Sequence, residues 1–193
     1  MKKLLNYLEK QKFAHDILKH RTVYTAHDLA TTLRVKLGEV AKNLLVQADR
    51  DYFIVVLPAS HNLHIKKFQQ FLKKNGYQAK TVKIPAEAVM SKLLKLKKES
   101  MNAFGSLYKL PVIVEKSLLK NKKMIMGFGK FNESLRIVTK DFQKMENPLV
   151  GLFGEKRKLK PTKTKRTSSE KTSLHKVSVK KKSPGKKSAG KKR

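Results

Sequence analysis

Aromatic residues are confined to one part of this chain. All nine Phe and all five Tyr residues lie before Glu155. A hydrophobic core needs large apolar side chains, so only the segment before Glu155 has the means to build one. The sequence therefore predicts one folded domain over residues 1–152, and we expect residues 153–193 to form a tail outside its core.

The C-terminal tail is strongly basic. The segment Glu155–Arg193 carries 17 Lys or Arg against two acidic residues and contains no aromatic residue. Blocks of like charge repel one another into extended, solvated conformations. We therefore expect a disordered arm that binds a polyanion, with a role in solubility or addressing as the alternative. The lysines expected to contact phosphates are Lys180, Lys181, Lys182, Lys186 and Lys187.

The positive charge extends into the folded segment. The chain has a net charge of +32, and Met1–Gly154 retains 29 basic and 12 acidic residues. Such an excess attracts nucleic-acid phosphates, an effect that salt weakens and that carries little sequence specificity. One face of a helix predicted over residues 63–75 gathers four lysines that we expect to contact nucleic acid: Lys66, Lys67, Lys73 and Lys74.

Several classes of protein are disfavoured by composition. The chain has no cysteine, which excludes disulfides, thiolate zinc sites and cysteine nucleophiles. The longest purely apolar run, Phe53–Leu57, is much shorter than the roughly 20 residues that cross a bilayer. We expect a cytoplasmic monomer without a membrane partner, a metal or a cofactor.

Apolar spacing and turn residues predict a mixed α and β domain. Thr25 is the expected N-cap of the second helix, and Asp49 and Asp51 are expected in a hairpin turn. In the fourth helix, Val89, Leu93 and Leu96 are expected to face the core. Helices are predicted around residues 4–8 and at 25–33, 63–75, 85–96 and 140–145, and strands at 13–18, 40–46, 52–57, 79–84, 110–114, 124–127 and 134–138.

Local catalytic motifs are missing. There is no Gly-x-Ser-x-Gly elbow, and no phosphate-binding glycine loop surrounds Gly129. His61 and His64 indicate surface or capping histidines and not a metal site. Taken alone, Lys42 is a lysine at the end of a strand, and the loop 101–111 is one whose Phe104 fills the core.

Together, however, five segments resemble a known family. In this order they are similar to the aminoacyl-tRNA deacylases, that is, to YbaK and the editing domains associated with prolyl-tRNA synthetase. The resemblance covers nearly all of Met1–Met145 and excludes the tail. The segments are Tyr24-Thr25-Ala26, Ala41-Lys42-Asn43-Leu44-Leu45-Val46, Val56-Leu57-Pro58-Ala59, Phe104–Val112 and Ser134-Leu135-Arg136-Ile137.

The resemblance implies both a fold and a reaction. The fold is a curved, partly barrel-like mixed sheet flanked by helices. The reaction is hydrolysis, in trans, of the ester that joins a wrong amino acid to the 3′ end of tRNA. Position, backbone donors, the terminal ribose hydroxyl and a held water activate the ester, and no side-chain nucleophile is required.

Site residues are carried over from the same resemblance. The family lysine corresponds to Lys42, a compact charge that would hold the phosphate of the terminal nucleotide. The family glycine corresponds to Gly129, and both are expected at the catalytic centre. The substrate contacts that the resemblance implies are Met101, Asn102, Phe104, Gly105, Phe131 and Ser134.

The sequence departs from the family pattern at two places. Where the family loop reads Gly-Ala-Met-Pro-Pro-Phe-Gly, this chain has Glu99 in place of the first glycine and lacks both prolines. Where the family has Ala-Gly-Thr-His, this chain keeps Gly129 but has Phe131, whose ring cannot exchange a proton. Two alternatives therefore stay open: a catalytically degenerate protein that binds tRNA or other RNA, and a nucleoid-type DNA-binding protein.

Overall fold

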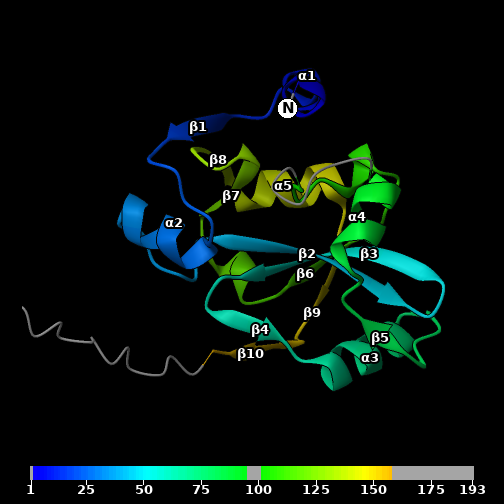
Figure 1. Cartoon of the computed structure of the whole chain (residues 1–193). Coiled ribbons are helices and arrows are strands. Elements are labelled where there is room, and N and C mark those ends of the chain that lie inside the picture. Colours follow the sequence, from blue (N-terminus) through cyan, green and yellow to red (C-terminus); the bar gives the residue numbers. More distant parts are fainter. Residues whose placement is uncertain (1, 95–100, 158–193) are drawn as a thin grey trace, which may run out of the picture. The chain divides into compact units, whose positions relative to one another are not determined.

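The computed structural model describes residues 2–94 and 101–157, and in them helices and strands alternate irregularly along the chain (Figure 1). The α-helices of this part are α1 (Lys2–Gln11), α2 (Ala26–Leu33), α3 (Ile65–Lys74), α4 (Glu87–Leu94) and α5 (Thr139–Glu146). Its strands are β1 (His15–Lys19), β2 (Ala41–Ala48), β3 (Asp51–Pro58), β4 (His61–Leu63), β5 (Val82–Lys83), β6 (Val112–Glu115), β7 (Lys123–Lys130), β8 (Glu133–Val138), β9 (Leu149–Gly151) and β10 (Gly154–Lys156). The predicted α+β class is confirmed.

The largest sheet is mixed and has the strand order β5-β2-β3-β6-β9. Strands β2 and β3 form the predicted antiparallel hairpin, whereas β6 runs parallel to β3 and β9 parallel to β6. Asp49 lies in the hairpin turn, with a φ of 48°, and its carboxylate accepts hydrogen bonds from the backbone N–H groups of Lys80 and Thr81. The turn prediction for Asp49 is therefore confirmed, and Asp51 begins β3.

Two smaller sheets complete the arrangement. Strands β1, β8 and β7 form an antiparallel sheet in that order, and β10 pairs with β4. The mixed sheet with flanking helices is confirmed. The strands of the described part form three separate sheets and close no barrel.

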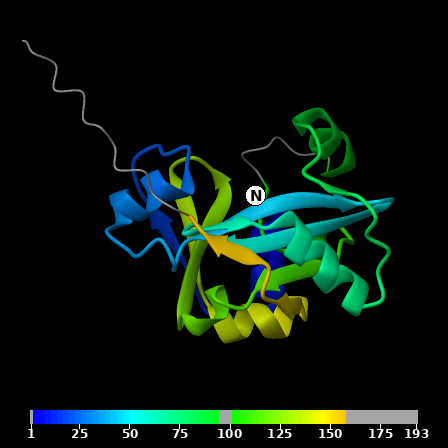
Figure 2. The ribbon, with the colours of Figure 1, turned by 90° about the horizontal axis from the view of Figure 1, so that it is seen from below.

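Alternating apolar residues bury both faces of the large sheet. On one face, Leu45 and Val56 pack with residues of α1, α4 and α5. On the other face, Val46 and Val55 pack against Phe68 of α3 and its neighbours. Figure 1 shows α4 and α5 above the β2–β3 pair and α3 below it, and in Figure 2, which is seen from below, α3 lies in front of these strands. The sheet is covered on both faces, and its accessible part is an edge.

Side chains cap two of the predicted helices. The Thr25 hydroxyl accepts from the backbone N–H of Asp28, as predicted for α2. At α3, His64 Nδ1 accepts from the backbone N–H of Lys67 at 3.4 Å, which confirms the capping role of this histidine.

Helix α4 presents a different face to the core from the one predicted. Met90 and Leu94 are buried, whereas Val89 and Leu93 are 39% and 42% exposed, so the predicted stripe is wrong by one residue. Both sets recur four residues apart, and because α4 is apolar on most sides, periodicity alone cannot choose between them. Leu96 lies outside the described residues.

The folded chain continues beyond the predicted domain end. Phe153 is fully buried, and β10 pairs with β4 through Gly154↔Leu63 and Lys156↔His61. The expected boundary after residue 152 is therefore too early, because this strand needs residues up to Lys156. The tail lysines Lys180, Lys181, Lys182, Lys186 and Lys187 lie outside the described residues.

Candidate functional site

A cavity of about 640 Å³ lies along one edge of β2. One wall is formed by six residues between His20 and Leu29, before and within α2. Another is formed by four residues of β7, β8 and the turn between them: Gly127, Lys130, Phe131 and Ser134. The opposite wall comes from Met101 and from residues 84–90, at the start of α4. The cavity therefore lies where segments distant in sequence meet.

The floor of the cavity is the backbone edge of β2. Five consecutive residues, 41–45, line it. Side chains alternate along a strand, so consecutive residues can share one cavity only through the strand's edge. On this side of β2, strand β5 pairs only with Gln47 and Ala48, which leaves residues 41–45 without a neighbouring strand in the described part of the chain.

The register shows which backbone groups point into the cavity. Residues of an antiparallel pair alternate between bonding to their partner strand and facing away from it. The Ala59 N–H donates to the Val40 carbonyl at 2.7 Å, so residues 40, 42 and 44 bond to β3. The N–H and C=O groups of Ala41, Asn43 and Leu45 therefore face the cavity.

Lys42 lies at this edge in a cationic surrounding. Its Nζ donates to the His61 carbonyl at 2.9 Å, which leaves two further N–H donors on the ammonium. Burial lowers the pKa of Lys42, and the charge of Arg157 lowers it further. Burial likewise lowers the pKa of His61; Glu115 opposes this, whereas Lys156 and Lys42 add to it. An anion bound here would relieve the repulsion among these cations.

Four of the predicted site residues share the cavity. Lys42, Met101, Phe131 and Ser134 all line it. They come from β2, from the loop before η2 (Gly105–Leu107), and from the β7–β8 region. The structure therefore brings Lys42, the lysine that the family resemblance places at the catalytic centre, together with three of the expected substrate contacts.

The other predicted site residues do not line the cavity, and each has a structural role. Phe104 is fully buried and packs edge-on against Tyr7 and Phe142, so it fills the core. Asn102 accepts from the Phe104 N–H at 2.9 Å and shapes the loop. A Cβ on Gly105 would run into the Leu110 carbonyl and the Val112 side chain.

Gly129 is the remaining predicted catalytic residue, and it is not among the residues that line the cavity. It has a φ of +92° and lies in an irregularity of the β7–β8 pairing between Gly127 and Lys130. Few residues other than glycine adopt this conformation, which explains the glycine. Glu99, at the place of the missing family glycine, lies outside the described residues.

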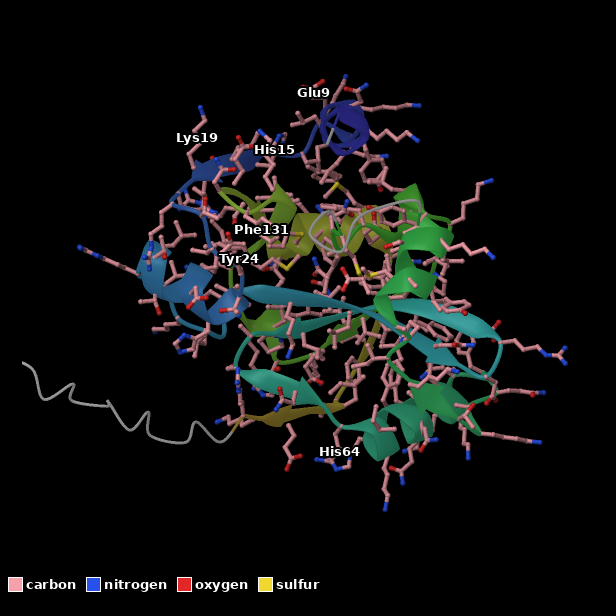
Figure 3. All side chains as sticks on the ribbon, viewed as in Figure 1. Glu9, His15, Lys19, Tyr24, His64 and Phe131 are labelled. Atoms are coloured by element: carbon pink, nitrogen blue, oxygen red, sulfur yellow. The ribbon has the colours of Figure 1, made fainter. Side chains whose placement is uncertain are left out.

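The four predicted lysines of α3 point to solvent. Lys66, Lys67, Lys73 and Lys74 are exposed, because Phe68 and Leu72 take the buried face of the helix. None of them lines the cavity. Figure 3 shows His64, which caps α3, well away from Tyr24 and Phe131.

An aromatic pair that was not predicted lies at the cavity. The rings of Tyr24 and Phe131 have centroids 4.7 Å apart and meet at 60° (Figure 3). Tyr24 is 74% exposed, and the Val23 N–H donates to the Phe131 carbonyl at 2.9 Å, which ties the two segments together. Phe131 is half-buried, and the exposed ring of Tyr24 beside it suits stacking against a flat ring.

Two polar residues were also missed. His20 follows β1 in the chain, and its Nε2 lies 2.9 Å from the hydroxyl of Ser134. Asn43 donates from Nδ2 to the Met101 carbonyl at 3.5 Å, while its buried Oδ1 has no partner among the described residues. Only the pairing of β1 with β8 could have revealed the contact between His20 and Ser134, which are 114 residues apart.

Comparisons with known proteins agree with this architecture. Residues 20–145 match the family described as the aminoacyl-tRNA editing domain. The solved structure of the hypothetical protein APE2540 has a TM-score of 0.69 at 18% identity, and the match covers 79% of this chain and 99% of that one. A candidate trans-editing enzyme for prolyl-tRNA synthetase has a TM-score of 0.69 at 14% identity, covering 80% of this chain and 96% of that one. No curated protein matches the sequence.

Two further kinds of feature are absent from the described residues. No group of three or more His, Cys, Asp or Glu side chains in this part of the chain could hold a metal ion. None of its helices is long and apolar enough to cross a membrane.

Proposed function

Because this chain belongs to the aminoacyl-tRNA editing domain family, we propose that it hydrolyses mischarged aminoacyl-tRNA in trans. The observation that carries the proposal is the cavity on the open edge of β2, which holds the family lysine, Lys42, within the matched segment. The cavity volume of about 640 Å³ lies in the range of small-molecule sites, and it suits an aminoacyl ester with its ribose.

Backbone donors of β2 suit the reaction. Attack on an ester carbonyl places negative charge on the carbonyl oxygen. The N–H groups of Ala41, Asn43 and Leu45 face the cavity and are held in place by the sheet, so they need no rearrangement to meet that charge. A single donor of this kind contributes about 3 kcal/mol to lowering a barrier.

Lys42 supports binding of the tRNA end through its charge. Its ammonium keeps two N–H donors beyond the bond to the His61 carbonyl, and Arg157 adds a second cation nearby. Together they would hold a phosphate of the terminal nucleotides.

Tyr24 and Phe131 supply the surface for a nucleobase. Stacking of a base on an aromatic side chain contributes about 1–3 kcal/mol and tolerates any base. Phe131 cannot transfer a proton as the family histidine could, but its ring adds an aromatic contact to the end of the tRNA. The exposed lysines of α3 and the basic tail would raise the local concentration of tRNA. We propose that the protein acts as a monomer in the cytoplasm.

The test is a deacylation panel with the full-length protein and tRNAs charged with non-cognate amino acids. We expect hydrolysis of at least one of them. Lys42→Ala should reduce its turnover by at least about 100-fold while the thermal unfolding midpoint stays unchanged. Lys120→Ala, at an exposed lysine that does not line the cavity, serves as the matched control.

Two results would contradict the proposal in different ways. Unchanged turnover in Lys42→Ala would exclude the role of this lysine. Tight tRNA binding without hydrolysis of any substrate would favour the alternative of a protein that only binds tRNA. The observation that favours this alternative is the replacement of the family histidine by Phe131.

A further inference from the structure

A group of cations lies beside Lys42, at the place where β10 pairs with β4. In this pairing Lys156 lies opposite His61, and the Arg157 N–H donates to the Ser60 carbonyl at 2.8 Å. The Lys42 ammonium donates to the next carbonyl along the chain, that of His61, at 2.9 Å. The backbone of Arg157 and the ammonium of Lys42 are therefore held by two consecutive residues, although they come from opposite ends of the domain sequence.

These positive charges have little to balance them. Burial lowers the pKa of Lys42, and the charge of Arg157 lowers it further, which shows that the two cations repel each other. Neither of the ion pairs in the described part of the chain involves Lys42, Lys156 or Arg157. The charge of Glu115 acts on His61, but Glu115 Oε2 accepts from two backbone N–H groups at the start of β10. A bound anion would therefore remove an uncompensated repulsion.

The side chain of Arg157 is available for such an anion. It is exposed, and it has no hydrogen-bond or ion-pair partner among the described residues. Glu155 lies on the same face of β10, because side chains alternate along a strand, yet it forms no ion pair with Arg157. A guanidinium offers a planar fork of N–H donors that matches two oxygens of one phosphate.

The position of β10 gives the direction from which an RNA strand would come. Lys42 lines the cavity and Arg157 does not, so the pair extends from the cavity to the surface beside it. Figures 1 and 2 show β10 ending on the side of the molecule where α2 lies, with α3 on the other side. A strand whose phosphate lies between Lys42 and Arg157 would therefore approach past β10 and not past the exposed lysines of α3.

We propose that Arg157 is a substrate-positioning residue that grips the RNA backbone together with Lys42. The phosphate that joins the last two nucleotides of tRNA lies between the ammonium and the guanidinium, and the 3′ strand enters the cavity along β10. This rests on the proposed function and deepens it, because β10 lies outside residues 20–145, the segment that matches the editing family.

The first experiment compares full-length variants on the most rapidly hydrolysed tRNA of the panel. Arg157→Ala should raise KM by about 10-fold and change kcat less than threefold, because it removes a charged contact to the substrate and no group at the ester. Arg157→Lys keeps the charge without the fork and should recover part of the loss. Lys67→Ala, at an exposed lysine of α3, is the matched control and should change KM less than threefold. Equal KM values for Arg157→Ala and the wild type would overturn the proposal.

The second experiment removes charge from the RNA. Short RNAs with the tRNA 3′ end each carry one neutral methylphosphonate linkage, at the last, second-last or third-last position, and fluorescence anisotropy measures their binding. The neutral last linkage should cost the wild type at least about threefold more affinity than it costs Arg157→Ala, because the variant has already lost that contact. The other two linkages should cost both proteins the same factor. If the last linkage also costs both proteins the same factor, Arg157 acts only through general charge or structure, and the proposed grip is wrong.

These measurements separate the two proposals, because binding of the short RNA requires no hydrolysis. If Arg157 and the last linkage are coupled but no mischarged tRNA is hydrolysed, the proposed function fails and the grip stands. If mischarged tRNA is hydrolysed and the coupling is absent, the role of Arg157 fails and the proposed function stands.

Discussion

Phe131 shows how a single residue can change the character of a site. A phenyl ring stands where the resemblance places a histidine, and it cannot donate or accept a proton. It contacts the exposed ring of Tyr24, so that two aromatic rings lie together at the cavity. An imidazole is nevertheless present in the same cavity, because His20 reaches Ser134 from the end of β1.

The aromatic pair is predicted to bind the nucleobase at the 3′ end of tRNA. Phe131→Ala should weaken binding of a short RNA with the tRNA 3′ end by about 1–3 kcal/mol, because one stacking partner is lost. Phe131→Tyr keeps the ring and is the control. Fluorescence anisotropy measures both dissociation constants, and equal affinity of Phe131→Ala and the wild type would rule out stacking.

Lys42 is predicted to lose its charge at a lower pH than an ordinary lysine. Burial and Arg157 both lower its pKa, and a lysine is charged only below its pKa. Its attraction for phosphate should therefore decline at a less alkaline pH than that of an exposed lysine. In Lys42→Arg this decline should be absent, because the guanidinium stays protonated.

The measurement is tRNA affinity as a function of alkaline pH at constant ionic strength. Other lysines titrate in both proteins, so the difference between the wild type and Lys42→Arg isolates residue 42. Superimposable pH profiles would argue against a phosphate contact by Lys42.

At the scale of elements, local chemistry and long-range contacts explain different features. The loop that begins at Met101 resembles the family in sequence, yet Asn102, Phe104 and Gly105 shape and pack the loop itself. Their pattern predicted a loop at this place in the chain. Packing decides which residues of the loop face the cavity. Of the four loop residues predicted to contact substrate, only Met101 lines the cavity.

Glu115 is predicted to hold the last strand in place. It is 2% exposed, and its Oε2 accepts from the backbone N–H groups of Phe153, at 2.7 Å, and Gly154. Glu115→Gln removes the negative charge from these hydrogen bonds and can place the side-chain NH2 group against the backbone N–H donors. This change should lower the free energy of unfolding by about 1–3 kcal/mol. Urea unfolding of the full chain measures this change.

The control for Glu115→Gln is the same substitution at an exposed residue of β10, the strand that Glu115 anchors. Glu155→Gln in β10 should change stability by less than about 0.5 kcal/mol. If both variants unfold at the same urea concentration as the wild type, the anchoring role of Glu115 is wrong.

At the scale of the whole molecule, we propose separate tasks for the basic tail and the domain. Binding through many lysines would be electrostatic and would not distinguish RNA from DNA, so the proposed chemistry would come from the cavity. The structure also shifts the place where the two parts can be separated. Cutting after Gly154 would remove most of β10 and Arg157, whereas cutting after Arg157 keeps both.

Truncation after Arg157 is predicted to weaken tRNA binding and to flatten its salt dependence. Residues 158–193 contain 15 Lys or Arg and one acidic residue. Each phosphate contact that is lost lowers the slope of log affinity against log salt by about 0.7–0.9. Deacylation at saturating tRNA should stay unchanged, because the cavity is intact.

Titration at several salt concentrations measures the slope for both proteins. An identical slope would show that the tail makes no phosphate contacts. Competition with duplex DNA, measured alongside, reports whether the tail distinguishes the two nucleic acids.

Composition and local patterning were enough to predict the α+β class, the hairpin around Asp49 and the cap at Thr25, because each of these depends on neighbouring residues or on counts along the chain. The likeness to editing domains was carried by the resemblance of five segments to a known family. Long-range packing alone decided the rest: the buried face of α4, the residues needed for β10, the open edge of β2 and the meeting of His20 with Ser134. These features arise only when distant segments pair, and no local pattern encodes which atoms they bring together.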